Sequence, residues 1–482
     1  MANDVMIQSF EWDTDGSGDF YKKLTKDAKK LKENGIDGIW LPPMTKGGSD
    51  MDVGYGVYDL WDLGEFDQKG TVRTKYGTKE ELLEAIAALE DAGIKCYADV
   101  VLNHKGNADF KETFKAVMVD QNNRSKDVEG EKDIEAWTGF DFSGRNGKYS
   151  DMVWHYYHFS GVDYDVKSDT SAIFRIVGDG KYWDDDVSGE KGNFDYLMYC
   201  DIDHDHPEVR EEIFKWVDWF IDETKVSGFR YDALKHISSD FIRDLTNHII
   251  NEKGEENFYL FGEFWQYNKE EIADYLEKTD YKIDLFDVPL HFHMSEASKS
   301  MGNYDMRKIF DNTMVSDFPS KCVTFVDNHD SQPGQSLESW VEVWFKEIAY
   351  ALILFRKDGY PCIFAGDYYG LNGEVKTDPM YDTLNDMMQI RKKYNYGNQD
   401  DYFDDPAVIG WVRRGDEEHP PLAVLISIKD AAEKQMHVGP DFKGKTFVDL
   451  SGKNEEITID DDGNGVFTVG PGSVTYWSIK ED

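Results

Sequence analysis

The sequence predicts an α/β protein built around a (β/α)8 TIM barrel, with an inserted β-rich domain after strand 3 and a C-terminal antiparallel β-sandwich domain. Three observations predict this fold. Short apolar runs alternate with helical segments until eight strands have been passed, which is the count of such a barrel. The alternation stops over residues 105–206, and after Gly397 only short strands follow.

The barrel elements are located by apolar runs and helix caps. Thr78 and Glu81 form a capping box at the start of a helix, and Pro207 is a favourable first helical residue. A long helix is expected over Ser339–Arg356. The eight predicted strands are Val5–Trp12, Gly38–Pro43, Cys96–His104, Ser227–His236, Asn257–Trp265, Ile283–Leu290, Lys321–Asp327 and Tyr360–Gly366.

The interruptions of the pattern set the domain boundaries. Residues 105–206 lack sustained helical periodicity and are too many for a loop in a compact fold, so we expect an inserted domain of short strands. The barrel then occupies 1–104 and 207–397, and the last domain 398–482. Its predicted strands are Val408–Val412, Leu422–Ile428, Thr446–Leu450, Gly465–Val469 and Thr475–Ile479.

Acidic residues dominate the charge. The chain has 95 Asp and Glu against 53 Lys and Arg, for a formal net charge of −42. The negative electrostatic field of such a chain repels nucleic acid and anionic membranes and suits a neutral substrate. A solvated acidic surface with no role in binding would give the same composition. The 27 Tyr and 13 Trp suit surfaces that stack on sugar rings.

The cysteines and the N-terminus favour a cytoplasmic protein. Cys96, Cys200, Cys322 and Cys362 are far apart, form no CxxC motif and are expected to be free buried thiols. The N-terminal residues show no signal peptide, and no apolar run approaches the ~18 residues of a membrane span. A secreted protein without its leader would show the same pattern.

The stretch Ser227–His236 begins as a buried strand and ends in charged residues. The residues alone leave two interpretations open. Arg230 and Asp232 could form a simple ion pair at a strand end, or the guanidinium could keep a carboxylate ionised in a cleft.

Other strand ends favour the second interpretation. Glu263 and Asp330 also follow strands, and barrel enzymes place their sites at these ends. Glycosidic bond hydrolysis requires two carboxyl groups. Asp232 beside Arg230 would stay ionised as the nucleophile, while the apolar neighbours Phe261 and Phe264 would raise the pKa of Glu263, as a proton donor requires.

Two further patterns could bind metal. The His291-Phe292-His293 motif occurs in metal-dependent barrel hydrolases, but here it follows strand six without further ligands, which argues against a metal site. The acidic residues of the insert could be a solvated surface or could supply the oxygen ligands that calcium prefers. They are Asp184, Asp195, Asp201, Asp203 and Asp205.

Four segments in order resemble the signature regions of the α-amylase family. They are Asp99–His104, Gly228–His236, Gly262–Trp265 and Phe325–Asp330. Further segments are similar to bacterial liquefying-type, cytoplasmic α-amylases: Gly35–Pro43, Gly54–Asp59 and Gly192–Tyr199.

This resemblance implies residue roles. Asp232 would be the nucleophile, Glu263 the acid/base and Asp330 the transition-state stabiliser. Substrate contacts would come from Tyr55, His104, Arg230, Lys235, His236, Trp265 and His329. Lys235 and His236 directly after the nucleophile strand favour α-1,4 over α-1,6 cleavage.

The resemblance also implies calcium. One Ca2+ would be bound by Asn103, Asp195, Asp201 and the backbone carbonyl of His236. A second metal group would use Asp184 and Asp203, but Ser160 stands where the family has an Asp ligand. We therefore expect one firmly bound calcium ion.

The function expected is a retaining, endo-acting α-amylase that acts as a monomer on α-glucans such as starch, glycogen and maltooligosaccharides. The alternatives are a maltogenic or transglycosylating enzyme of the same superfamily, or a non-catalytic glucan-binding barrel. The last typically lacks one of the three acids, and all three are present here.

Overall fold

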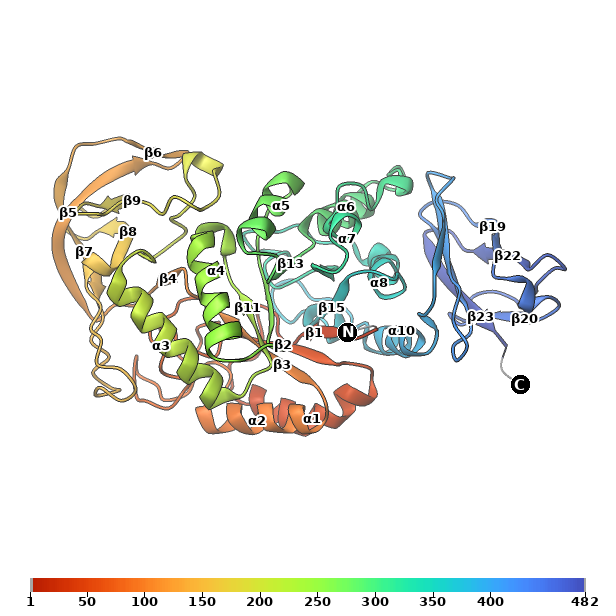
Figure 1. Ribbon diagram of the computed structural model, residues 1–482, viewed down its shortest axis with the longest axis horizontal. Helices are drawn as coiled ribbons and strands as arrows, with labels where there is room; N and C mark the ends of the chain where they lie inside the picture. Colours follow the sequence, from red (N-terminus) through yellow and green to blue (C-terminus); the bar gives the residue numbers. More distant parts are fainter. Residues whose placement is uncertain (1–2, 481–482) are drawn as a thin grey trace. The chain divides into compact units, whose positions relative to one another are not determined.

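The computed structural model describes residues 3–480 and confirms the predicted barrel. Eight parallel strands close in the order β1-β15-β14-β13-β12-β11-β3-β2 (Figure 1). Each is shorter than predicted, because the residues at the ends of the predicted runs belong to turns or to the following helix. The strands are β1 Met6–Gln8, β2 Gly38–Leu41, β3 Lys95–Val100, β11 Gly228–Tyr231, β12 Tyr259–Gly262, β13 Asp284–Phe286, β14 Cys322–Phe325 and β15 Tyr360–Phe364.

Two helices begin at the residues that the sequence predicts as helix starts. The side chain of Thr78 accepts a hydrogen bond from the backbone of Glu81 and the Glu81 carboxylate accepts one from the backbone of Thr78, so the capping box is confirmed. Pro207 begins α3 as predicted. The helices are α1 Phe20–Glu33, α2 Lys79–Asp91, α3 Pro207–Thr224, α4 Ser239–Asn247, α5 Lys269–Lys278, α6 Val288–Lys299, α7 Met314–Asp317, α8 Lys346–Leu354, α9 Ala365–Tyr368 and α10 Tyr381–Tyr394.

Two predicted elements are partly wrong. The strand expected over Ile283–Leu290 ends at Phe286, because the carboxylate of Asp287 accepts the N–H of Leu290 at 3.1 Å and caps α6. The helix expected from Ser339 begins only after Val341, whose N–H is donated to Asp327 Oδ2 at 3.2 Å.

The inserted segment is rich in strands, as predicted, and these strands form an antiparallel sheet. Its order is β4-β10-β8-β9-β5-β6, with β7 on β5 (Figure 1). Asp201 of β10 lies opposite His104 of β4, so the end of the insert returns to its beginning. The strands are β4 His104–Lys105, β5 Phe110–Asp120, β6 Asn123–Asp127, β7 Lys132–Gly139, β8 Phe159–Asp165, β9 Thr170–Ile176 and β10 Cys200–Ile202.

The C-terminal segment forms two antiparallel sheets, β16-β17-β18-β23-β20-β21 and β19-β22. Trp477, Phe467 and Phe447 are buried in its core. The sequence missed β16 and β19, which carry mostly polar side chains, and the two-residue strand β21. The strands are β16 Gln399–Tyr402, β17 Val408–Arg413, β18 Leu422–Ser427, β19 Ala432–His437, β20 Thr446–Asp449, β21 Ile457–Thr458, β22 Asn464–Val469 and β23 Ser473–Ile479.

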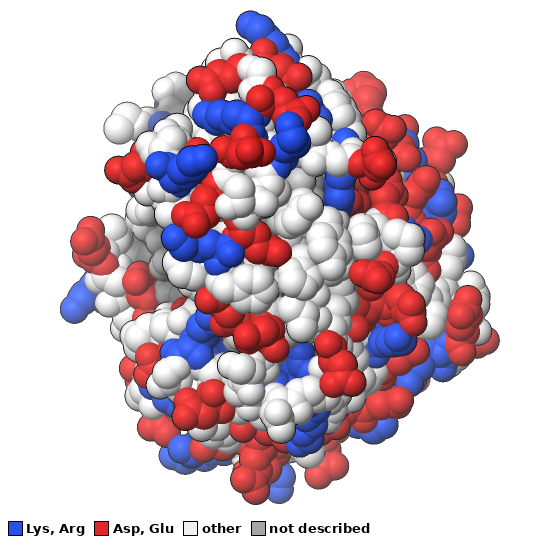
Figure 2. Space-filling model, turned by 90° about the vertical axis from the view of Figure 1, so that its left-hand side faces the viewer, with Lys and Arg blue, Asp and Glu red and all other residues white. Residues whose placement is uncertain are grey.

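The chain divides into two compact units, which we describe separately. Unit 1 comprises the chain up to Asp13, Leu31–Gly38 and the chain from Phe286 onward, whereas unit 2 comprises Thr14–Lys30 and Ile39–Leu285. Acidic side chains spread over the face shown in Figure 2, with Lys and Arg between them. Within residues 3–480, no helix has the length and apolarity needed to cross a membrane. All four cysteines are free and buried, as predicted.

Candidate active site

Unit 2 gathers three carboxylates around one fully buried guanidinium. Arg230 Nη1 donates to Asp99 Oδ1 at 3.0 Å and to Asp232 Oδ1 at 2.6 Å, and its Nη2 donates to Glu263 Oε2 at 2.5 Å. The expected pair of Arg230 and Asp232 is therefore present. The expectation that Glu263 lies in a purely apolar setting is incomplete, because its carboxylate binds the same cation.

Strand pairing positions two of these carboxylates. Tyr231 and Gly262 are the last residues of β11 and β12 and are partners in the parallel register. Asp232 and Glu263 follow them at equivalent positions. Their exposed fractions are 7% and 9%, whereas Arg230 is completely buried. The carboxyl groups of Asp232 and Glu263 thus retain some contact with solvent, whereas the cation that they bind has none.

Asp99 is the site residue to which the sequence analysis gave no role. It lies beside Arg230 in the register of β3 and β11, and its Oδ2 accepts hydrogen bonds from Trp40 Nε1 at 2.9 Å and Tyr55 OH at 2.8 Å. Burial raises the pKa of Asp99 to about 6, against the opposing charge of Arg230. The sequence placed Asp99 inside the predicted strand Cys96–His104, and only the strand order revealed its partner.

Two predicted substrate residues are connected to this cluster. The hydroxyl of Tyr55 donates to Asp99, and the backbone carbonyl of Tyr55 lies 2.8 Å from His104 Nε2. Burial lowers the pKa of His104, so the ring is neutral at pH 7. Tyr55 is therefore held by the carboxylate that also binds Arg230, and His104 is held by the backbone of Tyr55.

The residues after β11 form a second connected group. Lys235 Nζ donates to the carbonyl oxygen of Trp265 at 3.1 Å and pairs with Glu190 at 2.9 Å. His236 Nδ1 lies 2.6 Å from the carbonyl oxygen of Phe194, and burial lowers the pKa of His236 to about 3. The predicted contacts Lys235, His236 and Trp265 thus link the barrel to the insert.

Unit 1 holds the remaining predicted site residues, His329 and Asp330, after β14. His329 Nδ1 lies 2.9 Å from Gln8 Nε2 of β1, and its ring stacks on Trp12 at 6.1 Å. His329 Nε2 lies 3.3 Å from Asp330 Oδ2, whose side chain is 21% exposed. Gln8 and Trp12 were not predicted, since neither belongs to a charged motif.

The predicted calcium ligands Asn103, Asp195 and Asp201 lie close to the point where the insert returns to the barrel. Asp195 Oδ2 accepts the N–H of Asp184 at 3.0 Å, and Asp201 Oδ2 accepts Ser160 Oγ at 2.5 Å. Burial and the nearby Asp201 and Asp184 charges raise the pKa of Asp195, and burial raises that of Asp201 to about 7. Within residues 3–480, Asn103 Oδ1 and Asp201 Oδ1 are buried and accept no hydrogen bond. Such oxygens fit a hard cation.

The second predicted metal group is less suitable. Asp203 Oδ2 forms an ion pair with Lys181 Nζ, so this carboxylate already has a cationic partner. Ser160 offers a hydroxyl where a carboxylate was expected, and it is hydrogen-bonded to Asp201.

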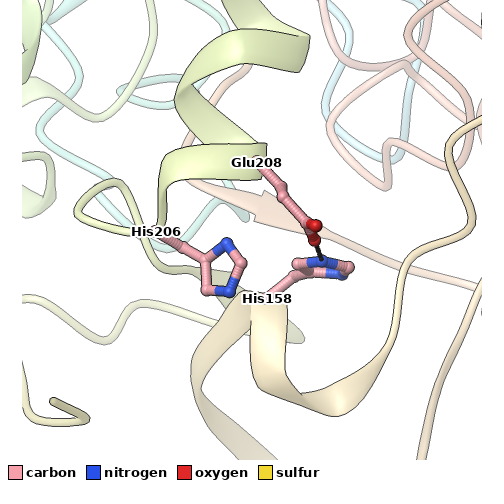
Figure 3. Close-up of side chains that lie close together, drawn as sticks. All are labelled: His158, His206 and Glu208. Carbon is pink, nitrogen blue, oxygen red and sulfur yellow. Dashed lines mark hydrogen bonds and ion pairs between the residues drawn. The ribbon is translucent and has the colours of Figure 1, made fainter.

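A third group could bind a metal by proximity alone. His158, His206 and Glu208 place ligand atoms within 4.8 Å of one another (Figure 3). The backbone N–H of His155 donates to His158 Nδ1 at 3.0 Å, so the neutral ring carries its proton on Nε2, 3.0 Å from Glu208 Oε2. A metal would have to displace that proton. His155, His158 and Glu208 are therefore better described as a hydrogen-bonded chain, against which the His206 ring packs edge-on at His158.

The His291-Phe292-His293 motif lies in α6 and does not belong to the group of potential metal ligands found within residues 3–480. His291 Nδ1 lies 2.7 Å from the carbonyl oxygen of Val326, and His293 Nδ1 lies 2.9 Å from that of Ile309. Both histidines are buried core residues.

The chain is similar to known carbohydrate-active proteins over its whole length. A family model described as "Alpha amylase, catalytic domain" matches residues 5–407. The chain is 48% identical to a glucan 1,4-alpha-maltohexaosidase of Bacillus sp. (strain 707), covering 99% of this chain and 93% of that protein. It is 39% identical to a cytoplasmic alpha-amylase of Escherichia coli (strain K12), with both chains fully covered. A solved alpha-amylase of Geobacillus thermoleovorans has the same fold, with a TM-score of 0.65, 17% identity and coverage of 100% and 99%.

The carboxylate cluster predicts how stability responds to loss of its cation. Arg230→Met should cost about 3–5 kcal/mol, because it leaves the buried Asp99 without its cation. Asp99→Asn, which leaves Arg230 two carboxylates, should cost about 1–3 kcal/mol. Urea unfolding at pH 7 measures the loss of stability in both variants. If Arg230→Met and Asp99→Asn were equally stable, the result would contradict this arrangement of charges.

The penalty of Arg230→Met should also grow from pH 5 to pH 8. Asp99 has a folded-state pKa of about 6, above its usual 3.8. A raised pKa contributes stability at low pH that is lost as the pH rises through the folded value. Without Arg230 that pKa rises further, so the variant loses more stability than the wild type on the alkaline side.

Proposed function

The chain belongs to the α-amylase family of glycoside hydrolases, and on that premise we propose that it is an endo-acting α-amylase. It would hydrolyse internal α-1,4-glucosidic bonds of starch, glycogen and maltooligosaccharides with retention of configuration. The observation that carries this proposal is the binding of Asp232 and Glu263 to two nitrogens of one guanidinium. This arrangement keeps two carboxyl groups close together at neighbouring strand ends, as a retaining glycosidase requires.

In the first step Asp232 would attack the anomeric carbon while Glu263 protonates the glycosidic oxygen. Arg230 donates to Oδ1 of Asp232, so attack falls to Oδ2. The bond from Arg230 to Oε2 of Glu263 leaves the transferable proton to Oε1. The sugar is then covalently bound to Asp232 and the leaving chain carries the proton from Glu263.

In the second step Glu263, now ionised, would take a proton from water, whose oxygen attacks the anomeric carbon and releases Asp232. We assign Asp330 to the stabilisation of positive charge in both transition states. Tyr55, His104, Lys235, His236, Trp265 and His329 are the proposed substrate contacts.

Product specificity is the main point on which related functions differ. The maltohexaosidase relative has a name that specifies product length, whereas the Escherichia coli relative is described simply as an alpha-amylase. A maltogenic or transglycosylating activity is the alternative within the superfamily. Chromatography of the products from soluble starch distinguishes these activities, since an endo-acting enzyme first releases a range of long oligosaccharides.

We further propose one calcium ion at the junction of insert and barrel, held by Asn103, Asp195, Asp201 and the carbonyl of His236. The buried oxygens of Asn103 and Asp201 that accept no hydrogen bond support this proposal. The ion would tie the return of the insert to its starting point. We propose only weak occupancy at Asp184 and Asp203, because of Ser160 and the ion pair with Lys181.

The proposed partner is an α-glucan, with no nucleic acid or membrane partner, and the proposed form is a cytoplasmic monomer. The net charge of −42 supports a neutral partner. The relative of Escherichia coli that is described as cytoplasmic, and four unpaired cysteines, support the location.

Asp232→Asn and Glu263→Gln should each lower kcat on soluble starch by about a thousandfold or more, because the two carboxyl groups act as one unit. Both variants should remain folded, since each keeps the shape of the side chain. Asp240→Asn, at an exposed position in α4, is the matched control and should behave as wild type. A variant of either catalytic residue that keeps more than about a tenth of the rate would refute the assignment.

The first product released from a maltooligosaccharide should be the α anomer. A nucleophile and an acid on adjacent strand ends that bind one guanidinium should be ~5–5.5 Å apart, too close to admit the water of an inverting reaction, in which the carboxyl groups are about 6.5–9.5 Å apart. Proton NMR during the first minutes distinguishes the anomers before mutarotation. An initial β anomer would exclude Asp232 as a nucleophile.

The melting temperature should fall with chelator and recover with calcium, and the recovery should be larger at pH 8 than at pH 5. The raised pKa of Asp201, about 7, means that metal-free protein loses stability as the pH rises through that value. Calcium binds the ionised form and offsets this loss. Asp201→Asn should abolish the response, whereas Asp203→Asn should largely keep it. If dialysed protein contained no calcium and its melting temperature did not change with chelator, the proposed site would be contradicted.

A further inference from the structure

One contact in unit 1 connects the first barrel strand to a predicted site residue. Gln8 is the last residue of β1 and His329 follows β14, and β15 separates these two strands in the barrel. Gln8 Nε2 nevertheless lies 2.9 Å from His329 Nδ1, and both residues are 1% exposed. The hydrogen bond that one ring nitrogen of a histidine makes decides which nitrogen carries the proton.

Aromatic neighbours and Gln8 together fix the orientation of the His329 ring. The ring lies almost parallel to that of Trp12, with 7° between the planes and 6.1 Å between the centroids. Phe10 packs against it at 5.2 Å and 46°. Turning the imidazole by half a revolution would place a carbon atom opposite Gln8 and lose the hydrogen bond. The positions of both ring nitrogens are therefore defined.

The second ring nitrogen faces a carboxylate. His329 Nε2 lies 3.3 Å from Asp330 Oδ2. The backbone that carries Asp330 is itself held, because Asn328 Oδ1 accepts the N–H groups of Asp330 at 2.9 Å and of Ser331 at 2.8 Å. The imidazole thus lies between an amide at Nδ1 and a carboxylate oxygen at Nε2.

These two neighbours favour one tautomer of His329. An ionised carboxylate can only accept hydrogen bonds, so Asp330 would repel a lone pair on Nε2. With the proton on Nε2, the nitrogen Nδ1 is an acceptor, and the amide nitrogen of Gln8 donates to it. Oε1 of Gln8 accepts no hydrogen bond from residues 3–480, so no other contact of that oxygen opposes this orientation of the amide.

We propose that Gln8 is a positioning residue that keeps the proton of His329 on Nε2, directed toward Asp330. This inference rests on the proposed function, in which His329 contacts the substrate and Asp330 stabilises positive charge. Gln8 is buried and acts through the histidine alone. With the other tautomer, a lone pair on Nε2 would push the Asp330 carboxylate out of place, and His329 would offer the substrate hydroxyls no donor.

The protonation of the ring can be measured in the wild-type chain without substrate. Proton–nitrogen NMR correlations of protein with isotope-labelled histidine distinguish a proton on Nε2, a proton on Nδ1 and a doubly protonated ring. The signals of His329 are those that His329→Gln removes. At pH 7 we expect a proton on Nε2 alone. A proton on Nδ1, or on both nitrogens, would overturn the inference while leaving the proposed function intact.

Gln8→Glu tests whether the amide acts on the reaction, because a carboxylate of similar length can only accept and draws a proton to Nδ1. We expect NMR to show a protonated Nδ1 and kcat/KM on maltohexaose to fall by about tenfold, the effect of losing one hydrogen bond. The decrease should be mainly in kcat, since Asp330 is assigned to the transition state. Gln121→Glu, the same change in the exposed turn after β5, is the matched control and should alter neither measurement.

An unchanged ring in Gln8→Glu, or a moved proton with unchanged kcat/KM, would contradict the positioning role. The wild-type NMR measurement keeps the inference testable even if Gln8→Glu does not fold. A wild-type chain that hydrolyses no α-glucan would instead refute the proposed function, and the inference with it.

Discussion

A guanidinium with no contact to solvent is the constraint on which the site of unit 2 depends. Arg230 has none of its surface exposed, and removing a charge from water costs several kcal/mol unless partners replace the water. Here three carboxylates do so, from the ends of three adjacent strands. The cation and the carboxylates can be buried only together. The requirement to neutralise Arg230 therefore also brings Asp232 and Glu263 to one point.

A second concentration of buried charge is handled differently. Asp195 and Asp201 are each 1% exposed, and their hydrogen bonds come from a backbone amide and a serine hydroxyl, which are neutral donors. Like charges placed this close raise one another's pKa. Asp195 and Asp201 therefore lack a cation that would balance their charges when both are ionised, and the proposed calcium ion would supply it. Asp203, which Lys181 neutralises, shows the alternative solution within the same segment.

Helix starts were predicted correctly where they depend on neighbouring residues and wrongly where they depend on distant ones. The capping box at Thr78 and the proline that begins α3 act through neighbours in the chain, and both were predicted correctly. The helix predicted over Ser339–Arg356 includes Val341. The amide of Val341 instead bonds to Asp327, which lies fourteen residues earlier. A contact of that range cannot be read from periodicity.

The sequence by itself predicted the eight-stranded barrel, the β-rich insert and the strand-end acids Asp232, Glu263 and Asp330. It could do so because apolar periodicity and charged strand ends are properties of consecutive residues. It also placed Arg230 beside Asp232, two positions apart on one strand. Only the tertiary structure decided that Glu263 and Asp99 bind the same guanidinium, and that Gln8 lies beside His329. Those contacts join segments far apart in the chain, and they exist only once parallel strands are in register and the barrel has closed.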